Sequence, residues 1–389
     1  MSGPTIAVVA TEASGDRLGG ALMQALRDRV PDAQFVGLGG PDMAGQGLKS
    51  LFPIDELAIV GIVAILARLP GLLRHIHETA DMIVAARPDV LVIIDSPEFT
   101  HRVARRVRKA LPDLPVVDYV SPSVWAWRPG RARAMRAYVD HVLALLPFEP
   151  AAHDKLGGPA CTYVGHPLAA EAARLRPGPA DAPRRAAEPP LVLVLPGSRR
   201  GELARLGGVF GATLKELVDR CGPVEAVLPT PPHLAARVRE ATVGWAVQPR
   251  IVVDQEEKWA AFRCARAALA ASGTVSLELA VAGVPTVVAY KVPAVEEAIA
   301  RLLIRVPTIV LANLVLGQNV MPELIQRDVT PQNLAALLAP LLADTPERRR
   351  QTKAFAALDA VMEIGTAQPS VRAADVVLEA LSRRASLEN

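Results

Sequence analysis

The chain has 389 residues, of which 51% are hydrophobic, 21% charged and only 4% aromatic, and its formal net charge at pH 7 is +3. This composition excludes a disordered chain, and the length favours two domains because single cores stop growing near about 250 to 300 residues. So small a charge gives no reason to expect a nucleic-acid partner, although it suits anionic ligands or an anionic membrane face. The three cysteines lie far apart without a Cys-x-x-Cys spacing, which argues against disulfides and zinc and favours a reducing compartment. No signal peptide is evident, so we expect a cytoplasmic protein.

Short apolar runs alternate with helical stretches along most of the chain. Runs with so little polar alternation predict parallel strands that are buried on both faces and joined by helical crossovers. The sequence therefore predicts an α/β protein with two doubly wound, Rossmann-like sheets, whose ligands bind beyond the carboxyl ends of the strands. The runs lie at 5–10, 90–95, 114–120, 141–146, 191–195, 224–229, 250–254, 267–272 and 285–290.

A segment rich in proline and charge divides the chain. Residues 173–189 have the composition of an interdomain linker. We therefore expect an N-terminal domain over 1–172 and a C-terminal domain over 190–365. Both domains begin in the same way, with an apolar strand, a polar loop and a helix.

In the N-terminal half, the first loop and the loop after the run at 90–95 carry candidate site residues. Asp95 ends a predicted strand, where a carboxylate could act as a general base, although most such residues only cap the next turn. The first loop places Glu12, Ser14, Gly15 and Asp16 in one tight turn, and a turn with a capping aspartate is the alternative.

An apolar stretch and a pair of tryptophans in this half have two interpretations each. Residues 57–77 are too short an apolar run to span a bilayer, which needs about 20 residues, but they could lie on a membrane or form a buried helix. The basic stretch 101–109 could add attraction to anionic lipid or form a solvated helix face. Trp125 and Trp127 could line an acceptor groove or pack in the core.

The C-terminal half opens with a strand that ends in the loop 196–202, Pro-Gly-Ser-Arg-Arg-Gly-Glu. Its two glycines permit close backbone approach, and arginines stand beside the amides of a helix N-terminus. This loop suits a diphosphate, whereas a capped turn with solvated arginines explains the same residues. The loop is not a Walker phosphate-binding loop, because the spacing Gly-x-x-x-x-Gly-Lys-Ser/Thr is absent.

A second loop of this kind lies between a strand and a short helix at 270–290. Ser272, Gly273 and Thr274 offer hydroxyls and amides, and Glu278 lies one turn into the helix, where it could accept hydrogen bonds from ribose hydroxyls. Helix capping and a carboxylate stabilised by the helix dipole explain the pattern equally well.

Nine segments together resemble lipid-A-disaccharide synthases over residues from about 10 to 326. The resemblance implies a GT-B glycosyltransferase with two Rossmann-like domains facing a cleft, which bind the acceptor and the UDP-sugar donor respectively. In this architecture the last helix often folds back onto the first domain. Whether residues 366–389 do so is not determined by the sequence. The segments read EASGDRLGG, IDSPEF, YVSPSVWAWRPGR, LPFE, YVGHPL, LPGSRRGE, ASGTVSLELA, VPTVVAY and MPELIQ.

The resemblance also implies the reaction. An inverting transfer would move 2,3-diacylglucosamine from its UDP derivative to the 6-hydroxyl of 2,3-diacylglucosamine 1-phosphate, forming a β(1→6) disaccharide and UDP in lipopolysaccharide synthesis. No cofactor and no metal are implied, since the chain has no Asp-x-Asp and arginines with helix dipoles would neutralise the diphosphate. The enzyme would bind peripherally to the cytoplasmic face of the inner membrane. A homodimer is one possible oligomeric state, which the sequence does not decide.

The implied roles fall on individual positions of this sequence. Asp95 matches the family's catalytic aspartate. The acceptor side would include Glu12, Ser14, Gly15, Asp16, Trp125 and Trp127, and the donor side would include Ser198, Arg199, Glu202, Ser272, Gly273, Thr274, Glu278, Asn313 and Gln318.

Three positions depart from the family's pattern, and related functions are the alternatives. Thr11 replaces a usual glycine, Glu98 replaces a commoner aspartate, and Gln318 stands where arginine is often found. A lipid II-forming transferase or a UDP-N-acetylglucosamine 2-epimerase would share the sheets and nucleotide turns. A catalytically silent nucleotide-sugar sensor would not need Asp95.

Overall fold

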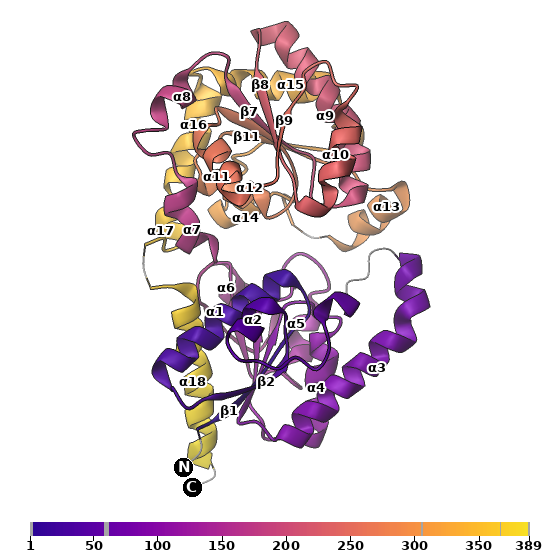
Figure 1. Cartoon of the computed structure of the whole chain (residues 1–389), viewed down its shortest axis with the longest axis vertical. Coiled ribbons are helices and arrows are strands. Elements are labelled where there is room, and N and C mark those ends of the chain that lie inside the picture. The colour runs from indigo at the N-terminus through magenta and orange to yellow at the C-terminus, as the bar shows by residue number, and fades with distance from the viewer. Residues whose placement is uncertain (1–2, 58–61, 305, 366, 388–389) are drawn as a thin grey trace. The chain divides into compact units, whose positions relative to one another are not determined.

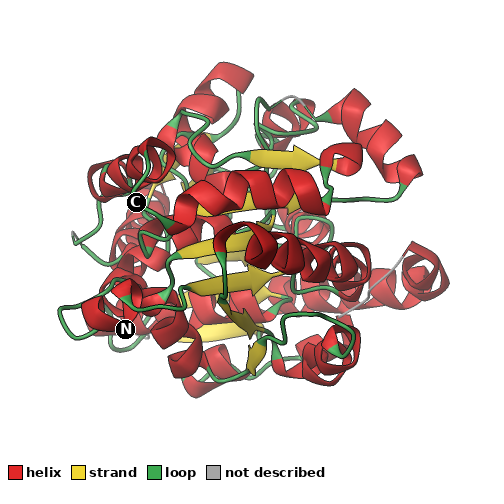
Figure 2. Ribbon diagram, turned by 90° about the horizontal axis from the view of Figure 1, so that it is seen from above, coloured by secondary structure: helices red, strands yellow, loops and turns green. Residues whose placement is uncertain are grey.

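The computed structural model describes residues 3–57, 62–304, 306–365 and 367–387. The chain forms two compact units, of which unit 1 comprises Met1–Pro167 with Thr366–Asn389 and unit 2 comprises Leu168–Gly365. Each unit is built on one six-stranded sheet. Helices flank the strands, as Figure 2 shows. The two sheets confirm the predicted α/β class.

The sheet of unit 1 is parallel throughout, and its strand order is β2-β1-β3-β4-β5-β6. Neighbouring strands β1 and β3 are in register with Ala10 opposite Ile94, so the loops that follow them begin side by side. The strands are β1 (Thr5–Ala10), β2 (Gln34–Leu38), β3 (Val90–Ile94), β4 (Val116–Tyr119), β5 (His141–Ala144) and β6 (Ala160–Tyr163).

Helices cover both faces of this sheet, because successive apolar residues of each strand point to opposite sides. Val92 belongs to the cluster on the α1 and α18 side, whereas Ile93 belongs to the cluster on the α3 and α4 side. The helices are α1 (Ala13–Arg29), α2 (Pro41–Gly45), η1 (Ile54–Leu57), α3 (Ile62–Ala86), α4 (Thr100–Ala110), α5 (Gly130–Met135), α6 (Glu149–Leu156) and α18 (Pro369–Leu387).

The C-terminal helix α18 packs against α1 within unit 1, where Figure 1 shows the yellow helix beside the indigo one. Ala373, Ala374 and Val377 are fully buried in the same cluster as Leu22 and Leu26 of α1. Burying this apolar stripe explains why the last residues of the chain belong to the first unit.

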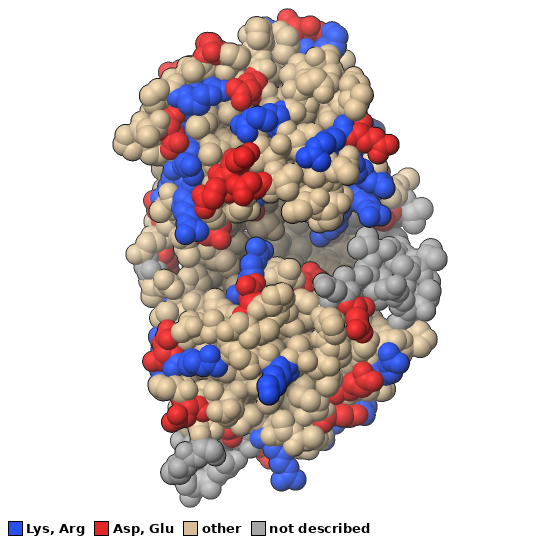
Figure 3. Space-filling view, in the orientation of Figure 1, with Lys and Arg blue, Asp and Glu red and all other residues tan. Residues whose placement is uncertain are grey.

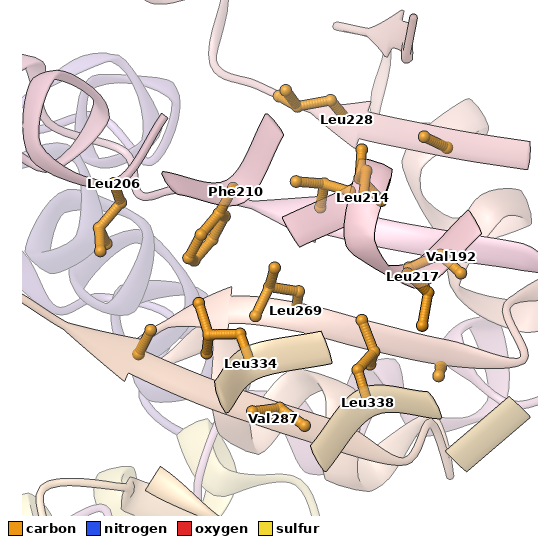
Figure 4. Packing of buried hydrophobic residues seen from close by; sticks show 14 of the residues in the cluster. Val192, Leu206, Phe210, Leu214, Leu217, Leu228, Leu269, Val287, Leu334 and Leu338 are labelled. Carbon is orange, nitrogen blue, oxygen red and sulfur yellow. The ribbon is translucent and has the colours of Figure 1, made fainter. Parts of the chain in front are cut away.

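Unit 2 repeats the same plan with the parallel strand order β12-β11-β10-β7-β8-β9. In its core, shown in Figure 4, Phe210 and Leu214 of α9 and Leu334 of α15 belong to one cluster with Leu269 of the central strand β10. The strands are β7 (Leu191–Leu195), β8 (Glu225–Pro229), β9 (Arg250–Val252), β10 (Ala267–Ala271), β11 (Thr286–Tyr290) and β12 (Glu323–Ile325).

The first two helices of unit 2 precede its first strand, β7. The helices of this unit, in chain order, are α7 (Leu168–Leu175), α8 (Ala182–Ala186), α9 (Arg200–Cys221), η2 (Pro232–Leu234), α10 (Ala235–Thr242), α11 (Gln255–Cys264), α12 (Val275–Val281), α13 (Ala294–Leu303), α14 (Leu311–Leu316), η3 (Gln326–Asp328), α15 (Pro331–Leu338), η4 (Ala339–Leu342), α16 (Pro346–Ala356) and α17 (Leu358–Val361).

The segment predicted as a linker, 173–189, is part of unit 2 and contains the end of α7 and all of α8. Its charged residues anchor it to the unit. Arg176 donates to a carboxylate oxygen of Asp359 at 3.0 Å, and Asp181 lies 3.4 Å from the guanidinium of Arg263. Composition alone does not reveal these partners, which lie 183 and 82 residues away along the chain.

The surface carries no strong preference for one sign of charge on the face that Figure 3 shows, where basic and acidic side chains are interspersed with uncharged ones. None of the helices in the described ranges combines the length and apolarity that a bilayer crossing requires. Of the apolar stretch 57–77, residues 58–61 and the side chains of 62–69 lie outside the described part of the structure.

Candidate active site

Asp95 follows β3 directly and sits in a strained turn at the carboxyl edge of the unit 1 sheet. Asp95 and Ser96 both have a left-handed backbone conformation, with φ of 53° and 45°. Residues that carry a Cβ rarely adopt this conformation. The Ser96 amide donates to the Asp95 carboxylate at 2.7 Å, and the Thr100 hydroxyl donates to the Asp95 carbonyl at 2.6 Å. These bonds hold the carboxylate of Asp95 in one orientation.

Burial raises the pKa of the Asp95 carboxyl, and the hydrogen bond from Ser96 opposes this effect only in part. The nearby negative charges of Glu12 and Asp118 raise the pKa further. A carboxylate whose pKa is raised is a stronger base than an ordinary aspartate. The turn therefore has the property that proton abstraction from a hydroxyl requires.

Glu12 reaches the same turn from the loop after β1. The Ser96 hydroxyl donates to its carboxylate at 2.8 Å, although the two residues are 84 positions apart. This contact follows from the adjacency of β1 and β3, which starts both loops at one edge of the sheet. The structure thus brings the predicted acceptor-side residue Glu12 beside the predicted base.

Glu12 is the N-cap of α1, so Gly15 and Asp16 lie in the first turn of this helix and not in the tight turn expected from the sequence. Asp16 is buried, and its two carboxylate oxygens accept from the backbone N–H groups of Gly40, Asp42 and Met43 at 2.7 to 3.1 Å. Asp16 therefore caps α2, and the acceptor-side role that the resemblance implies for it stays a prediction. A Cβ at Gly15 would lie 3.5 Å from the carbonyl oxygen of Ile94, which is an ordinary van der Waals distance, so the packing against β3 does not require glycine here.

Ser14 lies in the first turn of α1, and Thr11 lies between β1 and this helix. Ser14 is exposed and remains a candidate for acceptor contact. Thr11, where the family usually has glycine, does not adopt a positive φ, so its β-branched side chain fits the turn without strain.

The two tryptophans differ in role. Trp125 is half-buried, donates from Nε1 to the Glu149 carboxylate at 3.0 Å and packs edge-on against Phe148, so it helps to build the core of the loop. Trp127 is 36% exposed and carries the guanidinium of Arg128 at 4.4 Å from its ring centre. Of the pair, Trp127 is the one available to a ligand.

Glu149 is a buried carboxyl beneath this loop that the sequence did not single out as a site residue. Burial raises its pKa to about 7, against the effect of hydrogen bonds from Trp125 and from the Leu146 amide at 3.0 Å. A raised pKa means that the folded chain holds this proton more tightly than the unfolded chain. The associated stability is present below the ordinary pKa of 4.5 and is lost as the pH rises through about 7.

We expect Glu149→Gln, which cannot ionise, to remove this pH dependence. Between about pH 5 and about pH 8, the free energy of unfolding of the wild type should fall by about 2 kcal/mol relative to the variant. Urea unfolding followed by circular dichroism at a series of pH values measures the difference. Parallel pH profiles for the two proteins would contradict the prediction.

In unit 2, the loop between β7 and α9 is organised around its own carboxylate. One oxygen of Glu202 accepts from the amides of Ser198 and Arg199 at 3.0 and 3.2 Å, and the other lies 3.1 Å from the Arg199 guanidinium. A Cβ at Gly197, where φ is +114°, would lie 2.2 Å from this carboxylate, so only glycine fits. Glu202 is buried and therefore holds the loop, while the Arg199 side chain is 76% exposed and available to a ligand.

We expect Glu202→Ala to destabilise unit 2, because it leaves two loop amides without their acceptor. The free energy of unfolding should fall by about 1 to 3 kcal/mol, and the affinity for UDP should fall as well. Glu202→Gln is the matched control, since its amide oxygen can still accept from both N–H groups. Equal stability of the Ala variant and the wild type would show that the loop does not depend on this carboxylate.

The turn between β10 and α12 leaves part of its surface open. Gly273 has φ of +156°, and both Gly273 and Thr274 are exposed. The Ser272 hydroxyl donates to the carbonyl of Ile309 at 2.7 Å, so this side chain braces a neighbouring segment. The exposed part of the turn, and not Ser272, is placed to meet a ligand.

Glu278 is half-buried on α12 and forms an ion pair that the sequence did not predict. The ammonium of Lys258, on α11, donates to its carboxylate at 2.7 Å. The side chains of Lys258 and Glu278 retain 24% and 19% exposure, so the pair reaches the surface of unit 2. A carboxylate fixed at this point can accept hydrogen bonds from a diol.

Asn313 lies on α14 and Gln318 follows the end of this helix, and the two side chains differ in exposure. Asn313 is buried, and its side-chain amide accepts from the N–H groups of Val320 and Met321 and donates to the Met321 carbonyl, all at 2.9 to 3.0 Å. It therefore fixes the segment that follows α14, and its role at the donor site stays a prediction. Gln318 is exposed and remains a candidate.

The sequence matches a family model described as lipid-A-disaccharide synthetase over residues 6–373. The chain belongs to the lipid-A-disaccharide synthase family. The protein of that name from Nitrobacter hamburgensis is 59% identical over 377 residues, covering 97% of this chain and 95% of that protein. Its counterpart from Bradyrhizobium diazoefficiens is 56% identical over 379 residues, covering 97% of each chain. The protein is accordingly a glycosyltransferase that forms the lipid A disaccharide.

Solved structures with the same architecture include glycosyltransferases, which confirms the GT-B fold. The MurG protein of Acinetobacter baumannii superposes with a TM-score of 0.57 at 16% identity over 96% of this chain and 99% of that one. The UDP complex of Staphylococcus aureus MnaA gives 0.61 at 12% identity over 99% and 97%. Identities this low concern the fold alone, so the lipid-A-disaccharide synthase relatives decide against the alternative functions.

Proposed function

We propose that Asp95 is the general base of a single-displacement transfer to the acceptor 6-hydroxyl. The Asp95 carboxylate takes the hydroxyl proton as the oxygen bonds to C1 of the donor sugar, and the bond from C1 to UDP breaks with inversion. The observation that carries this proposal is the strained, hydrogen-bonded turn in which Asp95 has a raised pKa. Strain of this kind is typical of functional sites. Glu12 would keep the turn in place through Ser96.

The donor UDP group would bind to unit 2 without a metal ion. Glu278 would accept from the ribose hydroxyls, and the exposed Arg199 guanidinium would neutralise the diphosphate together with the exposed turn at Gly273 and Thr274. Two solved structures of similar fold, those of Staphylococcus aureus MnaA and Anabaena HepE, are complexes with UDP. They support a nucleotide site in this architecture.

The acylated substrates would be drawn from the cytoplasmic face of the inner membrane. Each acyl chain partitions into lipid with a free energy of about 0.8 kcal/mol per buried CH₂, so the sugars reach the enzyme at a bilayer surface. The protein would then bind the membrane peripherally. Flotation with vesicles that contain anionic lipid tests this, and an unbound protein would contradict it.

The reaction is tested with purified protein, UDP-2,3-diacylglucosamine and 2,3-diacylglucosamine 1-phosphate. We expect equal amounts of disaccharide and UDP, with the same rate in the presence of EDTA. A rate abolished by EDTA and restored by a divalent cation would overturn metal independence. Absence of disaccharide with every acyl length would overturn the substrate assignment.

A further inference from the structure

Three arginines converge on one carboxylate beside the Asp95 turn. Glu98 receives the Arg131 guanidinium at 2.5 Å and the Arg128 guanidinium at 3.5 Å on one oxygen, and the Arg102 guanidinium lies 3.8 Å from the other. We call Arg102, Arg128 and Arg131 the arginine cluster. Arg102 lies on α4, which follows β3, whereas Arg128 and Arg131 lie in the loop and helix that follow β4. The strands β3 and β4 are neighbours in the sheet.

The charge of this group is unbalanced. Three guanidinium groups face one carboxylate, which leaves two positive charges in excess. Although burial acts to raise it, the pKa of Glu98 lies below its ordinary value because Arg131, Arg128 and Arg102 stabilise the ionised form. A phosphate monoester carries about −1.5 to −2 at neutral pH, which matches the excess.

Two members of the cluster, Arg128 and Arg131, lie over the Trp127 ring. Arg128 has a left-handed backbone with φ of 52°, and its guanidinium stacks 4.4 Å from the Trp127 ring centre. The Arg131 guanidinium lies 5.9 Å from the same ring, and its side chain is only 17% exposed. Planar guanidinium groups in fixed positions suit bidentate contacts to phosphate oxygens better than mobile surface arginines do.

We propose that the arginine cluster binds the phosphate of the acceptor sugar. This inference rests on the proposed function, in which the acceptor is a glucosamine 1-phosphate whose 6-hydroxyl meets Asp95. Glu98 holds the guanidinium groups together while the site is empty and shares them with the phosphate when the acceptor binds.

The chain geometry is compatible with one sugar bridging the two groups. Glu98 is three residues after Asp95, so their Cα atoms are at most about 10 Å apart. A single pyranose ring with a phosphate on one carbon and a reactive hydroxyl on another fits within that span. Binding of the phosphate would thus orient the 6-hydroxyl toward the base.

The test compares two acceptors, 2,3-diacylglucosamine with and without its 1-phosphate. We expect the wild type to prefer the phosphorylated acceptor in kcat/KM. The double variant Arg128→Met with Arg131→Met should lose this preference by about 10- to 100-fold, because charge-assisted hydrogen bonds to phosphate are removed. Its kcat/KM should fall much less for the unphosphorylated acceptor than for the phosphorylated one, and its affinity for UDP should stay near the wild-type value.

A second variant guards against a disturbed loop. Arg102→Met leaves the stacking on Trp127 intact and should reduce the same preference by a smaller factor. Arg106→Met is the matched control, since Arg106 lies one turn along α4 and pairs with Asp81 at 3.1 Å, and it should keep the wild-type preference.

The outcomes separate this inference from the proposed function. If the wild type forms disaccharide but both cluster variants keep its preference, or lose both acceptors equally, the phosphate site is overturned while the reaction stands. The same holds if the wild type shows no preference. If the wild type forms no disaccharide from either acceptor, the proposed function fails and this inference fails with it.

Discussion

Asp95→Asn is expected to lower kcat by about 10²- to 10⁴-fold, because a general base contributes about that much to a reaction. Asparagine preserves the shape of the side chain, can accept the Ser96 N–H bond and tolerates the left-handed backbone, so the turn should persist. Rates measured at saturating donor and acceptor give the comparison. Full activity in the variant would leave Asp95 with a capping role only.

The variant should also be more stable than the wild type at neutral pH. Since the pKa of Asp95 is raised in the folded chain, the folded state favours the protonated carboxyl, and stability is lost as the pH rises through that pKa. Asparagine has no proton to lose and avoids this cost. Lower activity together with higher stability is the pattern of a functional residue that is unfavourable for the fold.

The pH dependence of the wild type provides an independent check. The base must be ionised, so kcat/KM should fall as the pH drops through the pKa of Asp95, at a pH above the ordinary aspartate value of 3.8. Asp113→Asn serves as the control for both experiments, because Asp113 is exposed in the loop before β4, which is the end of that strand away from the site. It should change neither the rate nor its pH profile.

The central strands of both sheets could be predicted from sequence, whereas several edge strands could not. β3 and β10 are buried along their whole length, and their continuous apolar runs indicate this directly. The strands β2, β6 and β12 lie at sheet edges, are partly exposed and have mixed composition. An edge strand is covered on fewer sides, so its sequence carries less of the hydrophobic signal.

Local sequence places Asp95 at the end of a strand, but it does not reveal the contacts between loops. Position after an apolar run leaves a base and a cap open for Asp95, and its catalytic role stays a prediction that rests on the family resemblance. Its bond network with Ser96 and Glu12 depends on the adjacency of β1 and β3, which no local pattern encodes. Likewise, no local pattern indicates that the side chains of Asp16 and Asn313 accept hydrogen bonds from backbone N–H groups of distant or later segments.

Glu278→Gln is expected to weaken UDP binding by about 10- to 100-fold, since a charged hydrogen-bond acceptor contributes about 1.5 to 3 kcal/mol and 1.4 kcal/mol is a factor of ten. Titration calorimetry with UDP measures the affinity directly, and the KM for the donor should rise in parallel while the KM for the acceptor stays unchanged. An unaltered affinity would mean that the Glu278 carboxylate only stabilises the end of α12.

We expect Lys258 to orient the Glu278 carboxylate through their ion pair. Lys258→Met retains most of the side-chain volume but removes the 2.7 Å bond to Glu278, so UDP affinity should fall by a smaller factor than in Glu278→Gln. Lys215→Met is the matched control, because Lys215 forms an exposed pair with Asp219 at 2.6 Å on α9. Tighter binding of UDP by Lys258→Met would instead show that the lysine competes with the ribose for the carboxylate. The two signs therefore distinguish an orienting lysine from a competing one at the same ion pair.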